Sequence, residues 1–74
     1  MTHPQCLYTP LDSSLLAAAA YSAHQTLELE FRSGAVYRYF AVPPIVFRSL
    51  LAATSKGAYF NRNVRNNSTY QRVA

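Results

Sequence analysis

The sequence predicts an α+β domain: a three-stranded antiparallel β-meander followed by two short helices packed on one face. Three observations lead to this prediction. Apolar and charged residues alternate over residues 26–32, and a Ser33-Gly34 turn leads into a second segment rich in aromatic residues. The pair Pro43-Pro44 then ends the sheet and begins a segment with helical spacing. Because the chain has only 74 residues, these elements make one domain.

Residues 1–11 are expected to form a loosely ordered lead-in, and residues 12–74 the single domain. The first segment of that domain, residues 13–22, contains four consecutive alanines and can be interpreted in two ways. Alanine is the best helix former, so local propensity favours a helix. However, an isolated helix of about ten residues is marginal in water, and a two-stranded hairpin on its own is also marginal. The residues alone therefore leave both helix and strand open for this segment.

The register of the central hairpin decides where its tyrosines point. A two-residue turn at Ser33-Gly34 would place Tyr37 and Tyr39 on the face opposite the core. A three-residue turn or a bulge would shift the register and send both rings inward. The two-residue turn also pairs Arg38 with Leu29, which is an unfavourable pair for a core. The sequence therefore favours the longer turn without excluding the shorter one.

Two helices are expected after the sheet. In the first, five residues share one apolar face: Val46, Phe47, Leu50, Leu51 and Thr54. Ser55 is expected to cap the second helix, whose inner side carries Phe60 and Val64. Asn66-Asn67 is expected to end it, since asparagine tolerates the left-handed conformation. Residues 70–73 are expected to form a short extended tail.

Charge is distributed asymmetrically along the chain. All three acidic residues lie before position 31 and all seven Lys and Arg lie after it, so residues 1–30 carry −3, residues 31–74 carry +7 and the total is +4. A basic segment of this kind indicates an anionic partner. The charged content of 14% and the hydrophobic content of 50% argue against an intrinsically disordered chain.

The residue types that usually carry catalysis or metal binding are scarce. His3 and His24 are far apart in the sequence and Cys6 is the single cysteine, so we expect no metal site and no cofactor. Glu28 and Glu30 share one side of a strand and are expected to be its solvated side, so we expect no enzyme. The N-terminal residues lack the features of a signal peptide, and the longest hydrophobic run is too short for a bilayer. We therefore expect a cytoplasmic protein without a membrane partner.

Two clusters, residues 36–43 and residues 55–62, place flat rings beside cations. Together they hold five of the ten aromatic residues and three of the seven basic residues. Aromatic rings stack on unpaired bases while cations contact phosphates, so this composition predicts a nucleic-acid-binding surface. The candidate binding residues are Tyr37, Arg38, Tyr39, Lys56, Arg62 and Arg65.

Taken in order, these segments resemble a KTSC domain, a family named for its occurrence at the C-terminus of some lysyl-tRNA synthetases and also found as small stand-alone bacterial proteins. The resemblance covers residues 12–72. It is carried by Asp12-Ser13-Ser14 with Tyr21, residues 26–31, Ser33-Gly34, residues 37–40, Val42-Pro43, residues 50–53, residues 55–57 and residues 59–61.

The resemblance implies a small α+β domain in which the segment that ends at Tyr21 is a strand, so we expect residues 14–21 to be mostly strand. The four alanines depart from the family pattern, which has β-branched residues and a glycine there. Tertiary pairing must therefore override the local helix propensity of this segment.

The synthetase context of the family implies RNA as a partner, either tRNA or a single strand. We therefore predict a non-catalytic binding module that binds RNA through its basic, aromatic surface. The alternative is a protein–protein interaction domain, including one that self-associates through an exposed sheet edge.

Overall fold

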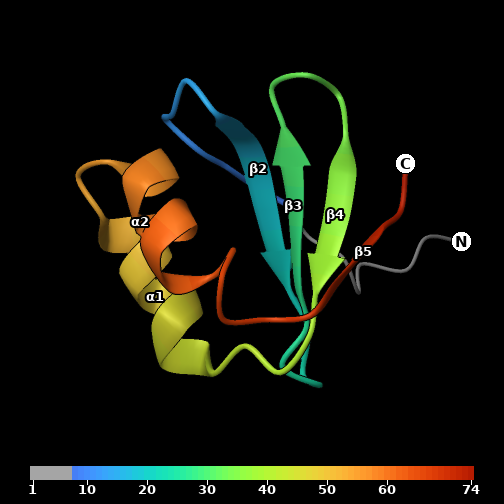
Figure 1. The fold of residues 1–74 in the computed structure, drawn as a ribbon. Helices are drawn as coiled ribbons and strands as arrows, with labels where there is room; N and C mark the ends of the chain where they lie inside the picture. The colour runs from blue at the N-terminus through green and yellow to red at the C-terminus, as the bar shows by residue number, and fades with distance from the viewer. Residues whose placement is uncertain (1–7) are drawn as a thin grey trace, which may run out of the picture.

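The sheet has five strands rather than the three that the sequence predicts. The computed structural model describes residues 8–74, and its strands follow one another in the antiparallel order β1-β2-β3-β4-β5. Both helices come between β4 and β5 and lie on the same side of the sheet (Figure 1). The elements are β1 (Thr9–Pro10), β2 (Leu16–Tyr21), β3 (Leu27–Phe31), β4 (Val36–Tyr39), α1 (Pro44–Ala52), α2 (Lys56–Asn63) and β5 (Tyr70–Arg72). The α+β class is confirmed, and the correction is one short strand at each edge of the meander.

The alanine-rich segment is strand β2, as the resemblance implies. β2 pairs with β1 on one side and with β3 on the other, and these pairings override the helix propensity of its alanines. Between Leu16 and Ala18 the register shifts by a bulge. Leu16 and Ala19 are both fully buried, so the bulge lets residues three apart reach the same core.

Part of the segment expected as a loosely ordered lead-in belongs to the sheet. Thr9–Pro10 forms β1, and Leu11 N donates a hydrogen bond of 2.9 Å to Ala17 O. Pro10 is tolerated because β1 is an edge strand, where one side of the backbone needs no partner. Leu11 is buried and joins the core, so the ordered domain begins before residue 12. Residues 1–7 lie outside the described part of the chain.

The hairpin of β3 and β4 has the longer of the two turns considered above. Phe31 N donates to Ala35 O over 2.8 Å, and Gly34 N donates to Phe31 O over 2.9 Å, so three residues connect the strands. Gly34 has a φ of +98°, in the left-handed region that this type of turn requires. The resulting register turns Tyr37 and Tyr39 toward the helices, because they lie opposite the buried leucines of β3.

The two helices cover one face of the sheet and complete the core. The Ser55 side chain accepts a hydrogen bond from Ala58 N at the start of α2, which confirms the predicted cap. Leu50 is fully buried, whereas Phe47 and Leu51 are half-buried at the margin of the core rather than deep within it. The buried cluster consists of Leu11, Leu16, Ala19, Leu27, Leu29, Tyr39, Val42, Leu50, Phe60 and Val64. Neither helix of the described chain is long and apolar enough to cross a membrane.

Candidate nucleic-acid interface

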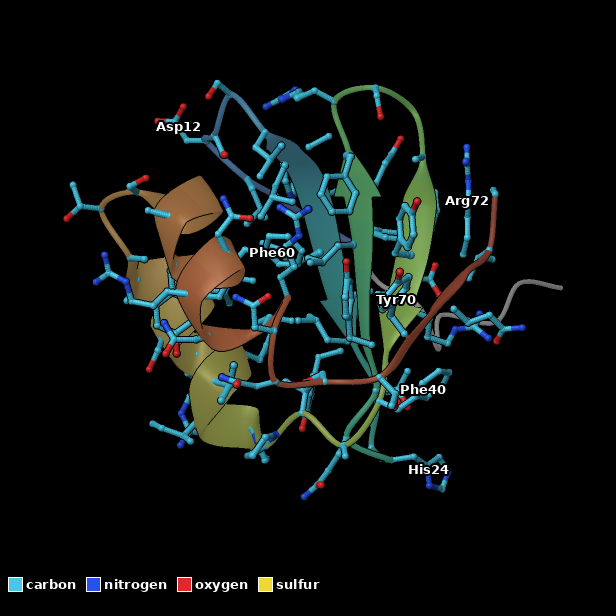
Figure 2. The ribbon with its side chains drawn as sticks, in the orientation of Figure 1. Asp12, His24, Phe40, Phe60, Tyr70 and Arg72 are labelled. Atoms are coloured by element: carbon cyan, nitrogen blue, oxygen red, sulfur yellow. The ribbon has the colours of Figure 1, made fainter. Side chains whose placement is uncertain are left out.

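An open groove of about 700 Å³ lies on the helix side of the sheet, between the C-terminal end of α2 and β5. Figure 2 shows Phe60 reaching from α2 toward the sheet, while Tyr70 and Arg72 project from β5. The strands β3 and β4 supply the floor, and residues from α2 and the segment after it supply one wall. We call this feature the α2–β5 groove; its aromatic and cationic lining consists of Phe31, Tyr37, Tyr39, Phe60, Arg65, Tyr70 and Arg72.

The floor of the groove is a set of rings in mutual contact. Phe60 and Tyr39 are the most buried of them, with 3% and 4% of their surfaces exposed, and their rings meet edge-on at a centroid distance of 5.4 Å. Two other rings contact Tyr37. The Phe31 ring lies edge-on to it at a centroid distance of 5.6 Å, and the Tyr70 ring lies tilted against it at 5.7 Å. Such contacts stabilise the floor and leave little ring face free for a ligand.

Tyr39 titrates unlike an exposed tyrosine. Burial and, to a smaller extent, the neighbouring phenols of Tyr37 and Tyr70 raise its pKa, and the Arg65 guanidinium lowers it; together they bring the pKa to about 12. The Tyr39 hydroxyl therefore stays neutral at every physiological pH. Its role is structural, because a buried neutral ring at the bottom of a groove supports the rings above it.

The rim of the groove carries the accessible chemistry. Tyr70 exposes 61% of its surface, far more than the other rings of the groove. The Arg72 guanidinium lies 5.9 Å from the centroid of the Tyr37 ring, within the range of a cation–π contact. Arg65 is exposed on the opposite wall, where its Nη1 donates to Asn61 Oδ1 over 3.3 Å. No acidic residue of the described chain lines the groove.

The structure brings three of the six predicted binding residues together and separates the others. Tyr37, Tyr39 and Arg65 all line the α2–β5 groove. Arg38 does not, because alternation along β4 turns it to the opposite face of the sheet, where it pairs with Glu28.

The two remaining cations lie away from the groove. Lys56 stands at the other end of α2, and its Nζ donates to Ala53 O over 2.9 Å. Arg62 is exposed on α2 but is not among the residues that line the groove. Arg62 and Arg65 therefore present their charges at different places, although they are only three residues apart.

Sequence reasoning missed Tyr70 and Arg72, the two groove residues that come from β5. A signal for them does exist, because residues two apart in an extended segment share one face. Residues 70–73 were expected to be extended, but without a predicted strand partner nothing indicated which face they would join. Pairing with β4 settles this, since Tyr70 lies opposite Tyr39 and Arg72 lies opposite Tyr37.

The opposite face of the sheet holds a smaller hollow of about 290 Å³ beside the Glu28–Arg38 pair. His24 and Tyr21 are at its border. Within residues 8–74, no three His, Cys, Asp or Glu side chains are grouped closely enough to hold a metal ion. His3 and Cys6, which the sequence-based expectation of no metal site also considered, lie outside the described residues. The α2–β5 groove is thus the larger and more cationic of the two hollows.

The chain is similar to two proteins that it covers over most of their length and to a small part of a lysine–tRNA ligase. A family model described as the KTSC domain matches residues 12–70. A protein of Tsukamurella paurometabola is 49% identical over 57 residues, which are 76% of this chain and 85% of that protein. An uncharacterized protein of Stutzerimonas stutzeri is 53% identical over 53 residues, covering 70% of this chain and 75% of the relative. A lysine–tRNA ligase of Nostoc punctiforme is 44% identical over 50 residues, covering 68% of this chain but 9% of the ligase.

A solved structure has the same fold. The crystal structure of a KTSC domain protein from Yersinia pestis superimposes with a TM-score of 0.87 at 25% sequence identity, covering 90% of this chain and 96% of that one. The family model spans β2 to the first residue of β5, which includes both walls of the groove except Arg72. By the extent of this match and by the identity of its relatives, the chain belongs to the KTSC domain family.

Proposed function

We propose that this domain is a non-catalytic module that binds single-stranded RNA in the α2–β5 groove. In this proposal an unpaired base stacks on Tyr70, while Arg65 and Arg72 contact the phosphates on either side of it. The observation that carries the proposal is the composition of the lining, in which the most exposed ring of the groove occurs together with two arginines and no acidic residue. Stacking platforms beside cations are the usual means of binding single strands.

The form of the groove favours unpaired over paired nucleic acid. A base can reach the Tyr70 ring only with one of its faces free, and bases in a duplex are stacked on both faces. The groove is also a binding cleft of ordinary size for a small part of a strand, with apolar rings and a few polar groups at its border. Cations alone would hold any polyanion, so the ring is what would favour a single strand.

The family relationship supports an RNA ligand on separate grounds. Lysine–tRNA ligases of cyanobacteria contain a segment similar to this chain, which places relatives of the domain in proteins named for a reaction on tRNA. The similar segment is only 9% of the Nostoc punctiforme ligase, so most of that chain has no counterpart in this domain. What extends to this domain is the expectation of an RNA partner, either tRNA or a free single strand.

The test is fluorescence anisotropy with labelled single-stranded RNA of about ten nucleotides, duplex RNA of the same length and tRNA, titrated between about 50 and about 200 mM salt. We expect the single strand to bind more tightly than the duplex, with an affinity that falls steeply as salt rises. Arg65→Ala should weaken binding to every RNA and reduce the slope of log K against log salt by about 0.7, the value for one phosphate contact with a single strand.

Arg62→Ala is the matched control, because it removes the same charge three residues away, from the last turn of α2 and outside the groove. If Arg62→Ala weakens binding as much as Arg65→Ala, the RNA is held by the general charge of α2 and not by the groove. Absence of binding to all three RNAs at low salt would exclude the function, and a protein partner for the groove would then be the better hypothesis.

A further inference from the structure

The hydrogen bonds between β4 and β5 show which backbone groups of β5 are already used. Val73 N donates to Val36 O over 2.7 Å, and Phe40 N donates to Thr69 O over 3.0 Å. Bonded and non-bonded pairs alternate along an antiparallel ladder. Residues 69 and 71 therefore direct their backbone groups toward β4, as does the N–H of Val73. The ladder ends there in a bulge, because Ala74 N also donates to Val36 O and Val36 N donates to Ala74 O.

The remaining residues of β5 direct theirs away from the sheet. Tyr70 and Arg72 occupy the non-bonded positions opposite Tyr39 and Tyr37, so their N–H and C=O groups point to the outer side of β5. In the part of the chain that the structure describes, β5 is the last strand of the sheet (Figure 1). Two residues therefore offer two outward donors and two outward acceptors along this edge.

We propose that this edge pairs with the same edge of a second copy of the chain. The two β5 strands would run antiparallel about a two-fold axis at Gln71, with Tyr70 of each copy opposite Arg72 of the other. Those two pairs would use the two outward donors and the two outward acceptors of each copy. Gln71 would lie opposite Gln71 of the second copy at the axis, as a non-bonded pair. The result is one continuous sheet of two domains.

A second copy fits this edge because the edge is complementary to itself. An isologous contact requires each surface to match its own rotated image, and a two-fold axis at Gln71 brings a ring to a cation on both sides of the axis. The same two residue types already make a contact within one chain, where the Arg72 guanidinium lies over the Tyr37 ring. Across the axis Tyr70 would offer Arg72 a second ring on the same face of the sheet.

Within residues 8–74, the three residues of β5 also lack the features that usually prevent pairing. Sheet edges are commonly protected by proline, by a bulge or by a covering element. β1, at the other edge, contains Pro10 and has only two residues, whereas β5 contains no proline and pairs with β4 in one continuous register. The bulge at Val73 and Ala74 comes only after its last residue. All three residues of β5 are exposed.

The predicted dimer is weak and depends on salt. A three-residue edge buries less than the roughly 1,200 Å² of a standard stable interface, so association is expected only at high protein concentration. Each copy carries a net charge of +4, and salt should strengthen the dimer by screening this repulsion. This dependence is opposite in sign to that of RNA binding, so the two phenomena can be separated by salt alone.

Cysteine cross-linking tests both the edge and the register. In a Cys6→Ser background, Gln71→Cys would place two thiols at the axis, where the Cα atoms of a non-bonded pair lie about 4.5 Å apart, within the range of a disulfide. Val73→Cys is the matched control, because the two copies of residue 73 would be separated by about 13 Å along the strands. Under mild oxidation at high salt we expect a covalent dimer from Gln71→Cys and much less from Val73→Cys.

Sedimentation of the unlinked chain supplies a second measurement. The average mass of the wild-type chain should rise with concentration toward that of a dimer. Arg72→Pro removes an outward N–H without removing a bond to β4, and it should abolish this rise, whereas Arg72→Ala keeps the N–H and should weaken the rise less. A constant monomer mass at millimolar concentration overturns the proposal, as do equal cross-linking of the two cysteine variants or equal association of the two Arg72 variants.

Discussion

Arg38 lies directly opposite Glu28 in the register of β3 and β4, and its Nη2 is 3.0 Å from Glu28 Oε1 on the face of the sheet away from the helices. A second contact, from Arg38 Nε to the same oxygen, measures 3.2 Å. One residue of the aromatic and basic run 36–43 is therefore committed to an ion pair, while its neighbours Tyr37 and Tyr39 line the groove on the other face. Alternation along a strand divides this run between two surfaces.

We expect Arg38→Ala to leave RNA binding unchanged and to destabilise the fold by about 1 kcal/mol, because the pair is only partly buried and its net contribution is modest. The exposed side-chain fractions are 40% for Arg38 and 14% for Glu28. Urea unfolding of Arg38→Ala, Glu28→Gln and the double variant would give the coupling free energy. A loss of RNA affinity in Arg38→Ala would mean that the ligand uses the opposite face.

The core prediction concerns Leu50, which is fully buried in α1. Leu50→Ala should lower the free energy of unfolding by roughly 2–5 kcal/mol, since it removes buried methyl groups and leaves a cavity. Ile45, on the same helix, exposes 57% of its surface, and Ile45→Ala should cost well under half as much. Chemical denaturation of both variants checks this, and similar losses in the two would mean that the buried face of α1 is misplaced.

The order of elements could be predicted because local signals agree there. Pro43-Pro44 lacks the N–H groups that a strand would need and suits the start of a helix, and Ser55 suits the N-cap that it occupies. The strand count could not be predicted in the same way, since β1 and β5 are short and carry no alternating pattern of their own. They exist because the edges of the central meander have free backbone groups for them to pair with.

The sequence predicted the residue types of the candidate site better than it predicted their positions in the fold. The groove does contain rings beside cations, and Tyr37 and Arg65 both line it. The ring with the greatest exposure, Tyr70, was not identified, because its position depends on the pairing of β5 with β4 across a long separation in sequence. Helical spacing of three residues predicts that Arg62 and Arg65 share one face, but α2 ends at Asn63 and Arg65 lies beyond that end. Spacing on an ideal helix no longer applies to residues beyond that end.

Gly34 should be required by the conformation of its turn rather than by space. A Cβ at this position would meet no heavy atom within 4 Å, yet its φ is +98°. Gly34→Ala should therefore destabilise the domain by about 1–2 kcal/mol through backbone strain alone. Gly34→Asn should cost less, since asparagine tolerates positive φ, and Ser33→Ala serves as a control in the same turn. Equal stability of the alanine variant and wild type, measured by urea unfolding, would contradict this reasoning.

Tyr39 should make the domain lose stability at alkaline pH. Its pKa is about 12 in the folded state against a usual value of 10.0, so above pH 10 the unfolded chain releases a proton that the folded chain retains. Stability from this group is complete below pH 10 and falls as the pH rises toward 12. Denaturation at a series of pH values should show this fall, and Tyr39→Phe should reduce it.

The same tyrosine reports on Arg65 independently of RNA. Because the Arg65 guanidinium lowers the pKa of Tyr39, Arg65→Ala should move its ionisation to still higher pH in a spectrophotometric titration of the phenols. Arg62→Ala, outside the groove, should leave this titration unchanged. An identical titration in wild type and Arg65→Ala would show that Arg65 does not lie over the groove floor in solution, which would also weaken its assignment as a phosphate contact.

The sharpest functional prediction contrasts two rings of the α2–β5 groove. Tyr70 exposes 61% of its surface, whereas Tyr37 is enclosed by Phe31, Tyr70 and Arg72. Tyr70→Leu should weaken binding of single-stranded RNA by about 1–3 kcal/mol, the usual value of one stacked base, with little effect on the weaker binding of duplex RNA. It should destabilise the fold less than Tyr37→Leu, because Tyr70 is mostly exposed although its ring lies 5.7 Å from Tyr37 and 5.8 Å from Tyr39.

Tyr37→Leu should show the reverse pattern, because it removes ring contacts within the floor and lowers the free energy of unfolding before it affects a ligand. Anisotropy titrations and urea unfolding of both variants measure the two effects side by side. If Tyr37→Leu loses single-strand affinity at undiminished stability while Tyr70→Leu binds normally, the base stacks within the floor. The rim of β5 would then have no part in recognition, and the sequence-based choice of Tyr37 over Tyr70 would be the correct one.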